Sequence, residues 1–434
     1  MATLWNKNNK KKTHPVVERY TAGTDHIFDV FLFPFDIEAT LVHAKGLKKI
    51  GILTAAELGK IEKALSALSR DVVGKRIRIR PEDEDCHTVI ENYLVAKLGD
   101  TGKKVHTGRS RNDQVLVAMR LYMKHALGSV RAQCLDLAEL FITKAERYAR
   151  VPMPGYSHTQ QAMLTSVGHY FASFAESLLD DEALLASIAR HIDKNPLGSA
   201  AGFGTAIPLD RAYTTRELGF ADVQINSLYC QSSRGKFESA FLEGLSQVSA
   251  TLARFANDMI LFTSQEFSFF SADESVVTGS SIMPHKKNLD PLELARGSAS
   301  ILIGNHVAVK ELSRNLLSGY NRDLQLMKKP LMESVRSVSE TLSVIAIVLQ
   351  RLVPNEKEIL AKIHPGMFTA DIANDMVMTE GVPFRDAYRM AAEMTGDTVD
   401  FAKNLSSKKS IGAPGNLSLA AYKRRLKTQR SSIR

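Results

Sequence analysis

Residues 279–288, Gly-Ser-Ser-Ile-Met-Pro-His-Lys-Lys-Asn, gather hydroxyl, ammonium and amide groups in one short segment. Glycine and the paired serines favour a loop, Pro284 ends any strand pairing, and Asp290-Pro291 predicts the start of a helix. Backbone N–H groups and the two lysines would then converge on an anion. An ordinary surface loop would explain the glycine and the proline, but not the order Met-Pro-His-Lys-Lys-Asn. The segment therefore predicts an anion-binding loop at the entry to a helix.

Residues 106–114, His-Thr-Gly-Arg-Ser-Arg-Asn-Asp-Gln, form a second polar run at the entry to a long helix. The arginines, hydroxyls and amides suit a carboxylate that is held by bidentate and backbone hydrogen bonds at a helix N-terminus. The alternative is an elaborate N-cap, since Ser110 and Asn112 can both cap a helix. Capping needs only one such residue, so the run favours a binding site.

Two further runs are polar where a helical protein would prefer apolar residues. Residues 155–161 contain His158, and a histidine can donate or accept a proton near neutral pH. A lone histidine at such a position is more often structural. Residues 320–328 lie between apolar helical segments, and surface exposure would explain their composition equally well. The role of each run therefore depends on what lies beside it.

Long helices must position these runs. Residues 114–148 contain no proline and a single glycine, and similar stretches cover residues 165–192, 234–267 and 330–352. Their broad apolar faces can be buried only against other long helices, within the chain or across subunits. A monomeric helical bundle and a coiled coil are the alternatives, although sustained heptads are not obvious.

The pattern predicts an all-α protein with three domains. Residues 1–108 would form an N-terminal helical domain, residues 109–352 a central long-helix bundle domain, and residues 353–434 a small C-terminal helical domain with a basic tail. Thr54 and Glu57 match a capping box at the start of a helix over residues 54–69. We expect the compact part of the C-terminal domain to end near residue 405.

Composition bounds the class of protein. A chain of 434 residues with 44% hydrophobic and 24% charged residues is typical of a globular protein. The net charge of +9 is concentrated in residues 1–17 and 401–434, which contain lysine and arginine but no acidic residue. No aromatic-rich basic motif accompanies these ends, so a nucleic-acid-binding protein is only a distant alternative.

The cysteines and the first residues favour a cytoplasmic location. Cys86, Cys134 and Cys230 are odd in number and widely spaced, which gives neither a disulfide framework nor a zinc pattern. Met1 to Lys12 are polar and lysine-rich, and no run of about 18 apolar residues occurs in the chain. We therefore expect no membrane partner, and the absence of an aromatic-rich basic motif argues against a nucleic-acid partner.

The first run resembles the signature loop of the fumarase/aspartase superfamily, whose members eliminate fumarate or a close analogue from succinyl compounds. Residues 106–114 narrow the resemblance to the argininosuccinate lyases. The similarity extends over nearly the whole chain and includes residues 20–46, 84–88, 195–202, 369–371 and 381–385. It implies a three-domain fumarase/aspartase-like fold, whose central bundle of long helices builds the core of a homotetramer with active sites shared between subunits.

The resemblance also implies the reaction, which is reversible elimination of fumarate from argininosuccinate to give arginine, the last step of arginine biosynthesis. It implies that the reaction uses no metal and no cofactor. Removing a proton beside a carboxylate creates a dianion, so positive charge and N–H donors must lie where that charge develops. The motif positions assign this stabilisation to Lys286 and Asn288. They make Ser280 the base for the Cβ proton, and His158, oriented by Glu293, the acid or its relay.

His87 is a second candidate for proton transfer, and its division of labour with His158 stays open. A neutral serine hydroxyl is a weak base, so Ser280 would need nearby cations and N–H donors that favour its alkoxide. Ser110, Arg111 and Asn112 match ligands of the fumarate-side carboxylates. The arginine half and the remaining carboxylate would be bound by Tyr320, Gln325 and Lys328, together with Asp29 and Ser157.

The chain departs from the family pattern at a few positions. Leu289 replaces a proline after Asn288, so the loop is expected to be less constrained in φ. Ser157 replaces a threonine, Gly235 replaces an aspartate, and Cys86 beside His87 is unusual. The remaining alternatives are another superfamily lyase, acting on adenylosuccinate or aspartate, and a non-enzymatic relative of the lens crystallins.

Overall fold

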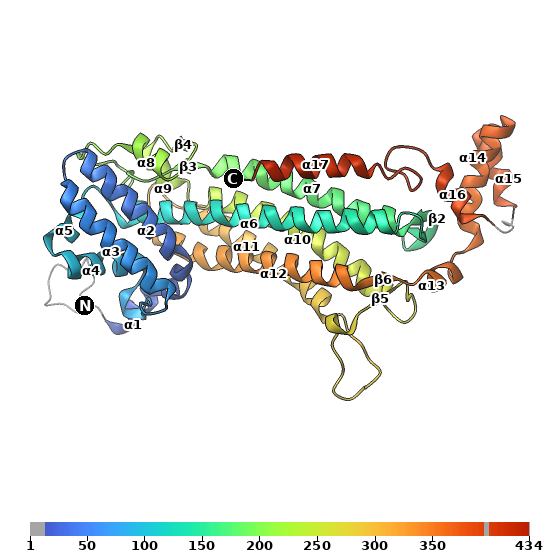
Figure 1. The fold of residues 1–434 in the computed structure, drawn as a ribbon, viewed down its shortest axis with the longest axis horizontal. Helices are drawn as coiled ribbons and strands as arrows, with labels where there is room; N and C mark the ends of the chain where they lie inside the picture. The colour runs from blue at the N-terminus through green and yellow to red at the C-terminus, as the bar shows by residue number, and fades with distance from the viewer. Residues whose placement is uncertain (1–13, 395–398, 434) are drawn as a thin grey trace. The chain divides into compact units, whose positions relative to one another are not determined.

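The computed structural model describes residues 14–394 and 399–433, and the chain divides into two compact units (Figure 1). Unit 1 comprises Met1–Ser129, Leu185–Leu245 and Leu302–Arg336. Unit 2 comprises Val130–Leu184, Ser246–Ile301 and Ser337–Arg434. Each unit consists of three separate stretches of the chain, whereas the domains predicted from the sequence are continuous. The two units therefore do not test the predicted boundaries near residues 108 and 352, and the three-domain division stays a prediction.

The long helices supply residues to both units. They are α6 (Arg111–Arg147), α7 (Val167–Ile192), α10 (Lys236–Phe262), α11 (Asp290–Ser313) and α12 (Lys328–Arg351). The helices that the sequence predicts over residues 114–148, 165–192, 234–267 and 330–352 are thereby confirmed. Helix α10 ends before its predicted limit because the chain turns back, and the N–H of Phe269 donates to the carbonyl of Phe262.

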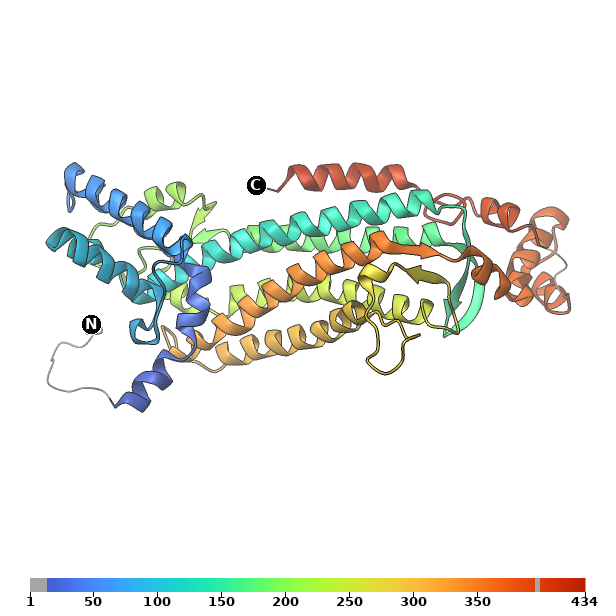
Figure 2. The same cartoon turned by 60° about the horizontal axis from the view of Figure 1, so that its bottom comes forward.

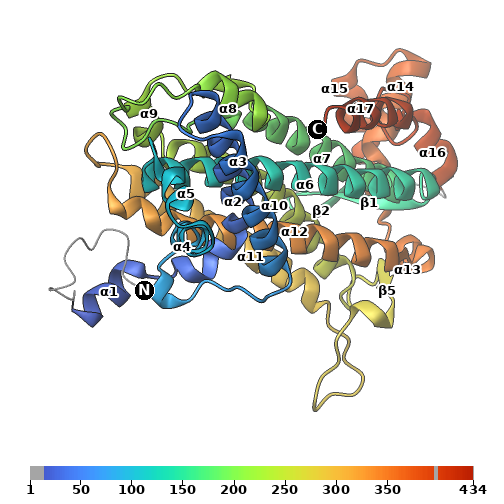
Figure 3. The same ribbon diagram turned by 60° about the vertical axis from the view of Figure 1, so that its left-hand side comes forward.

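Unit 1 adds shorter elements around the N-terminal half of α6. These are α1 (Pro15–Ala22), α2 (Asp25–Lys49), α3 (Ala55–Val73), η1 (Pro81–Asp83), α4 (Cys86–Leu98), α5 (Asp100–Lys103), η2 (Lys104–His106), β3 (Lys194–Asn195), α8 (Arg211–Glu217), β4 (Asp222–Val223), α9 (Ser227–Ser232) and η4 (Arg322–Met327). The predicted capping box of α3 is confirmed, since Thr54 and Glu57 each bond the other's backbone N–H. Helices α2, α3 and α4 lie side by side (Figure 3), and the parallel pair β3 and β4 is two residues long.

Unit 2 adds four strands, which form two antiparallel pairs, and the C-terminal helices. These are β1 (Pro152–Ser157), β2 (Gln160–Ser166), β5 (Phe270–Ala272), η3 (Glu274–Val276), β6 (Leu352–Pro354), α13 (Glu356–Ala361), η5 (Pro365–Phe368), α14 (Thr369–Glu380), α15 (Phe384–Ala392), α16 (Phe401–Ser407) and α17 (Leu419–Ser431), with β1 paired to β2 and β5 to β6. The hairpin β1–β2 was missing from the sequence prediction. Pro152 and Pro154 disguise β1, because proline gives no N–H to a ladder and reads as a loop residue.

Each unit has its own apolar core. In unit 1, Val42 of α2 packs with Val117 and Leu121 of α6 and with Phe220. In unit 2, the ring centroids of Phe141, Phe174 and Phe255 lie within 5.6 Å of one another, with one pair stacked and two pairs edge-to-face. The all-α fold that the sequence predicts is confirmed, with short strands only.

The basic tail is ordered, which corrects the expectation that the compact chain ends near residue 405. Helix α17 runs alongside parts of α6 and α7 in unit 2 (Figure 2). Its Arg430 pairs with Asp136 and Glu139 of α6 at 2.8 and 3.0 Å, and Lys423 pairs with Glu146 at 2.8 Å. Acidic residues on the two long helices therefore bind the tail. In the described part of the chain, no helix is long and apolar enough to cross a membrane.

Candidate active site

Unit 1 contains a polar pocket of about 190 Å³. Its lining comes from the start of α2, the segment before α4, the start of α6 and the segment that leads into α12. The lining residues are Asp25, Glu84, Asp85, Arg111, Asn112, Val115, Arg234, Tyr320, Arg322, Gln325 and Lys328. The structure thus brings together five residues that the sequence predicts as substrate ligands, namely Arg111, Asn112, Tyr320, Gln325 and Lys328.

Lys328 lines one side of this pocket and is buried. Its ammonium lies 2.7 Å from a carboxylate oxygen of Asp25 and 2.6 Å from Oδ1 of Asp29, and its side chain is 3% exposed. Burial lowers the pKa of Lys328, but the two carboxylates outweigh burial and raise it. Burial also raises the pKa of Asp25, against the opposing effect of Lys328. Asp29, predicted as a substrate ligand, lies beneath the lining as a partner of Lys328.

Arg111 is bound by carboxylates of its own chain. Its guanidinium lies 2.5 Å from Asp85 and 3.2 Å from Glu84, and it donates to Oγ1 of Thr88 at 3.2 Å. Burial raises the pKa of Asp85, but His87 and then Arg111 outweigh burial and hold it below the usual value. Asp85 also caps α4, because it accepts the N–H of Thr88. A substrate carboxylate would have to share Arg111 with these residues.

The segment before α12 is tied to the end of α1. Arg322 donates to Glu84 at 2.6 Å and to the carbonyl of Thr21 at 2.9 Å. Gln325 donates its amide to Thr21 and Ala22 and accepts from Arg322. These bonds fix the segment and occupy the Gln325 amide. Tyr320 is 37% exposed and faces the Arg234 guanidinium, 5.6 Å from its ring centre.

Hydrogen bonds to the side chain of Asp113 fix the N-terminus of α6. This buried carboxylate accepts hydrogen bonds from the N–H groups of Ser110, Gly198 and Ala200. Ser110 accepts the N–H of Asn112 through its hydroxyl at 3.2 Å. Ser110 therefore acts as an N-cap of α6, as the alternative interpretation of this run proposed. Arg111 and Asn112 line the pocket.

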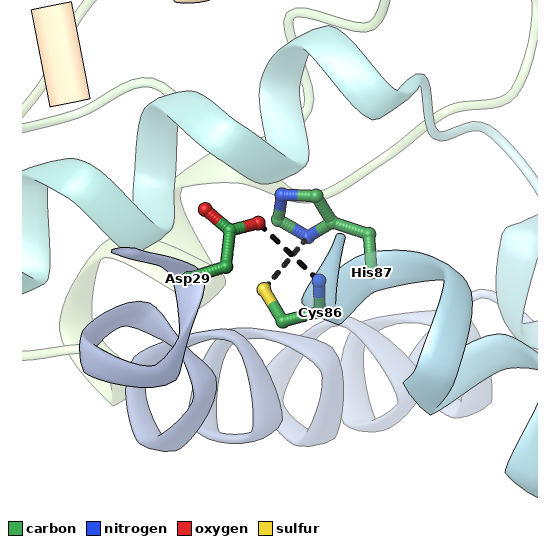
Figure 4. A group of neighbouring side chains, drawn as sticks. All are labelled: Asp29, Cys86 and His87. Atoms are coloured by element: carbon green, nitrogen blue, oxygen red, sulfur yellow. Dashed lines mark hydrogen bonds between the residues drawn. The ribbon is translucent and has the colours of Figure 1, made fainter. Parts of the chain in front are cut away.

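His87 is buried beside the pocket on α4. Its Nδ1 lies 2.6 Å from Oδ2 of Asp36. Burial lowers the pKa of His87, but Asp36 outweighs burial and raises it. Figure 4 shows His87 with its neighbour Cys86 and with Asp29 of α2. The predicted proton-transfer residue is thus held in a carboxylate-rich cluster.

The other predicted residues lie in unit 2. His158 and Thr159 form the two-residue turn between β1 and β2, and both have positive φ, 51° and 61°. Two consecutive left-handed residues define a type I′ turn, which is unusual without glycine or asparagine and is typical of a functional position. His158 and Ser157 are exposed at the tip of this hairpin.

The predicted pairing of His158 with Glu293 is not made within the chain. Over the described residues, no hydrogen bond or ion pair joins the two side chains, and Glu293 is exposed on the first turns of α11. The hairpin tip and the start of α11 are each fixed by their own backbone bonds. An orienting role for Glu293 therefore needs a second chain, and it stays a prediction.

The loop of residues 279–288 extends away from the helices of unit 2 (Figures 1 and 3). Thr278 and Asn288 close its base through two backbone hydrogen bonds of 2.9 Å. At its tip, the Ser280 hydroxyl accepts the N–H groups of Ile282 at 3.4 Å and Met283 at 3.1 Å. Lys286 is exposed. The loop therefore presents the Ser280 hydroxyl with two backbone N–H donors, and the role of Ser280 as a base stays a prediction.

Leu289 anchors this loop. The side chain is 8% exposed and its carbonyl accepts the N–H groups of Leu292 and Glu293. Burial of an apolar side chain holds the junction where the family pattern has proline. The loop is thus fixed at Leu289 by packing rather than by restriction of φ.

Sequence reasoning predicted Asp29 but missed the other acidic residues in and around the pocket. Asp25, Asp29 and Asp36 lie on one face of α2, because their spacings of four and seven residues return to the same side of a helix. Acidic residues at helical spacing within an otherwise apolar segment were the available signal. Glu84, Asp85 and Arg322 fall within the runs 84–88 and 320–328 that the sequence marked, but no individual role was assigned to them.

Comparisons with known proteins identify chains of similar sequence and fold. A family model described as a lyase matches residues 10–304. The argininosuccinate lyase of Thermotoga neapolitana is 44% identical over 384 residues, which cover 88% of this chain and 96% of that protein. The argininosuccinate lyase of Sorangium cellulosum is 42% identical over 425 residues, 98% of each chain. A solved structure of an EDDS lyase in complex with formate has the same fold, with a TM-score of 0.81, 21% identity, and coverage of 98% of this chain and 92% of that chain.

Proposed function

Because the chain belongs to the lyase family and, within it, to the argininosuccinate lyases, we propose that it cleaves argininosuccinate reversibly to arginine and fumarate. The observation that carries the proposal is the pocket of unit 1. There, residues of the run 106–114, which narrows the resemblance to this family, and of the polar run 320–328 line one cavity. Cleavage of a carbon–nitrogen bond is the reaction class.

The charges of the pocket suit this substrate. Argininosuccinate carries a substituted guanidinium, an ammonium and three carboxylates, so its site must offer both signs of charge. Arg111, Arg234 and Arg322 line the pocket together with the carboxylates of Asp25, Glu84 and Asp85. Bidentate arginine binding suits the succinyl carboxylates, and the acidic residues suit the cationic groups of the arginine half.

Ser280 is the proposed base. Proton removal from the succinyl Cβ leaves a dianion, and the N–H groups of Ile282 and Met283 already point at the serine oxygen, where they favour its alkoxide. Lys286 and Asn288 would stabilise the dianion as it forms. His158 would then protonate the guanidine nitrogen as the C–N bond breaks, which releases arginine and fumarate.

The site is proposed to be completed by neighbouring copies of the chain in a homotetramer. Support comes from the exposure of His158, Lys286 and Glu293, and from the pocket itself, whose lining lies wholly in unit 1. Mixed tetramers of Ser280→Ala and His158→Ala chains should then regain part of the activity through hybrid sites that hold both wild-type residues. Full inactivity of the mixture, with subunit exchange verified by mass, would argue against shared sites.

Substrate identity is tested by offering argininosuccinate, adenylosuccinate and aspartate separately to the purified protein and following fumarate by its ultraviolet absorbance. Release from argininosuccinate alone is expected. Release from either of the others would favour the alternative lyases, and no release from any of them would favour a crystallin-like relative. The cytoplasmic location stays a prediction that fits three free, buried cysteines among the described residues.

A further inference from the structure

Cys86 lies in a cluster of side chains whose donor atoms match those of a transition-metal site. An oxygen of Asp29, the sulfur of Cys86 and a ring nitrogen of His87 all lie within 4.8 Å of one another, and all three residues are buried. Figure 4 shows them converging from α2 and from the first turn of α4. Thiolate, imidazole and carboxylate are the ligand types that Zn²⁺ and Co²⁺ accept.

The spacing of these atoms is close to that of a tetrahedral ion. Bond lengths of about 2.0–2.3 Å to nitrogen, oxygen and sulfur place neighbouring ligand atoms about 3.3–3.6 Å apart. The Cys86 sulfur is 3.9 Å from Nδ1 of His87, so this pair needs only a small side-chain adjustment. Asp36 can supply a fourth donor, since its Oδ2 lies 3.8 Å from the sulfur. Its 2.6 Å contact with Nδ1 of His87 is a hydrogen bond, shorter than the spacing between two ligands, and binding of the ion would replace it.

Several of these atoms have few competing partners. Oδ2 of Asp29 accepts only a long hydrogen bond, 3.3 Å, from the N–H of Cys86, whereas Oδ1 holds Lys328. Oδ1 of Asp36 is buried and has no hydrogen-bond partner among the described residues, whereas Nδ1 of His87 is hydrogen-bonded to Oδ2 of Asp36. Buried polar atoms without partners are uncommon and indicate that a group fits beside them.

The surrounding charge also favours a cation. The cluster contains the carboxyl groups of Asp29 and Asp36 beside Cys86, and Asp25 contacts the same Lys328 ammonium as Asp29. Lys328 and Arg109 partly offset them, with Arg109 3.8 Å from Asp36. Cys86 contributes the sulfur donor of the cluster and is buried.

We propose that Asp29, Cys86 and His87, with Asp36 as the fourth ligand, form a binding site for one borderline-soft divalent cation, Zn²⁺ or Co²⁺. The ion binds Oδ2 of Asp29, the Cys86 thiolate and Nδ1 of His87, so Oδ1 of Asp29 can keep its bond to Lys328. Binding fixes the positions of the His87 ring and of the Asp29 carboxylate, which lies beneath the pocket lining. If the proposed function holds, the ion inhibits cleavage of argininosuccinate, and this second consequence rests on that function.

The test is a titration of the purified full-length protein with Co²⁺, followed by absorbance, in the presence of a thiol-free reductant. A cobalt–thiolate charge-transfer band and intense visible bands, saturating at one ion per chain, are expected. Cys86→Ser should abolish the charge-transfer band, while Cys134→Ala and Cys230→Ala should retain it, since those free cysteines lie elsewhere. Asp36→Asn should weaken binding about 10- to 100-fold.

Circular dichroism and thermal unfolding of each variant establish that it is folded. The absence of a thiolate band in the folded wild-type protein would overturn the site, and so would a band that survives Cys86→Ser. Fumarate release is measured on the same samples with and without Zn²⁺. Activity that persists with a saturated cobalt site would overturn the inhibition alone, whereas a protein inactive even without metal would refute the proposed function and leave the spectroscopic result standing.

Discussion

Lys328→Met is the perturbation that the pocket's electrostatics predict most sharply. The Lys328 ammonium is buried between Asp25 and Asp29 at 2.7 and 2.6 Å. Removing one partner of a buried ion pair leaves an uncompensated charge and costs about 3–5 kcal/mol. Here two carboxylates lose their cation, so the free energy of unfolding should fall by at least the lower end of that range.

The assay is urea unfolding of Lys328→Met beside Lys287→Met. Lys287 pairs with Glu274 at 2.9 Å, but the two side chains are 61% and 84% exposed, so its loss should cost less than about 1 kcal/mol. Adding Asp29→Asn to Lys328→Met should recover part of the stability, because it removes one of the two carboxylates that the lysine substitution leaves without a cation. Equal losses for the two lysine variants, or no recovery in the double variant, would refute this reading of the pocket.

Two further predictions concern stability away from the pocket. Burial raises the pKa of Asp181 to about 6 from an ordinary value of 3.8, so its contribution becomes unfavourable as pH rises through that window. Asp181→Asn can still accept the hydrogen bond from Thr251, so it should stabilise the protein by up to about 3 kcal/mol near pH 7.5 and give no gain below about pH 4. Urea unfolding midpoints at several pH values measure this gain, and a gain that does not depend on pH would contradict the prediction. Gly235→Ala should destabilise by about 1–3 kcal/mol, because φ is +86° and a Cβ would lie 2.2 Å from that of Ser313, whereas Gly59→Ala in α3, with open space around it, should stabilise by about 0.5–1 kcal/mol. Thermal unfolding distinguishes the two, and equal shifts would refute the steric argument.

The sequence predicted the long helices well because they depend on local features. Residues 114–148 lack proline and present a broad apolar face, and α6 forms over nearly that range. The hairpin around His158 was missed because Pro152 and Pro154 hide the strand period, and a two-residue turn with positive φ at His158 and Thr159 has no glycine to announce it.

The candidate site was predictable in part. The motif residues Arg111, Tyr320 and Lys328 could be named from their runs, and they do line one pocket. Their carboxylate partners could not, because pairing of Asp25 with Lys328 joins residues 303 positions apart. Such contacts depend on how helices pack, and packing is not encoded in any short run of residues.

The most direct measurement is the rate of fumarate release from argininosuccinate by the wild-type protein, Ser280→Ala and Ser281→Ala, measured side by side. The two serines are neighbours in one loop, but only Ser280 accepts backbone N–H bonds at its hydroxyl in the described structure. Wild type and Ser281→Ala should release fumarate at similar rates, and Ser280→Ala should be slower by about 10²- to 10⁴-fold. Failure of the wild type to release fumarate, or a Ser280→Ala rate equal to that of Ser281→Ala, would contradict the account.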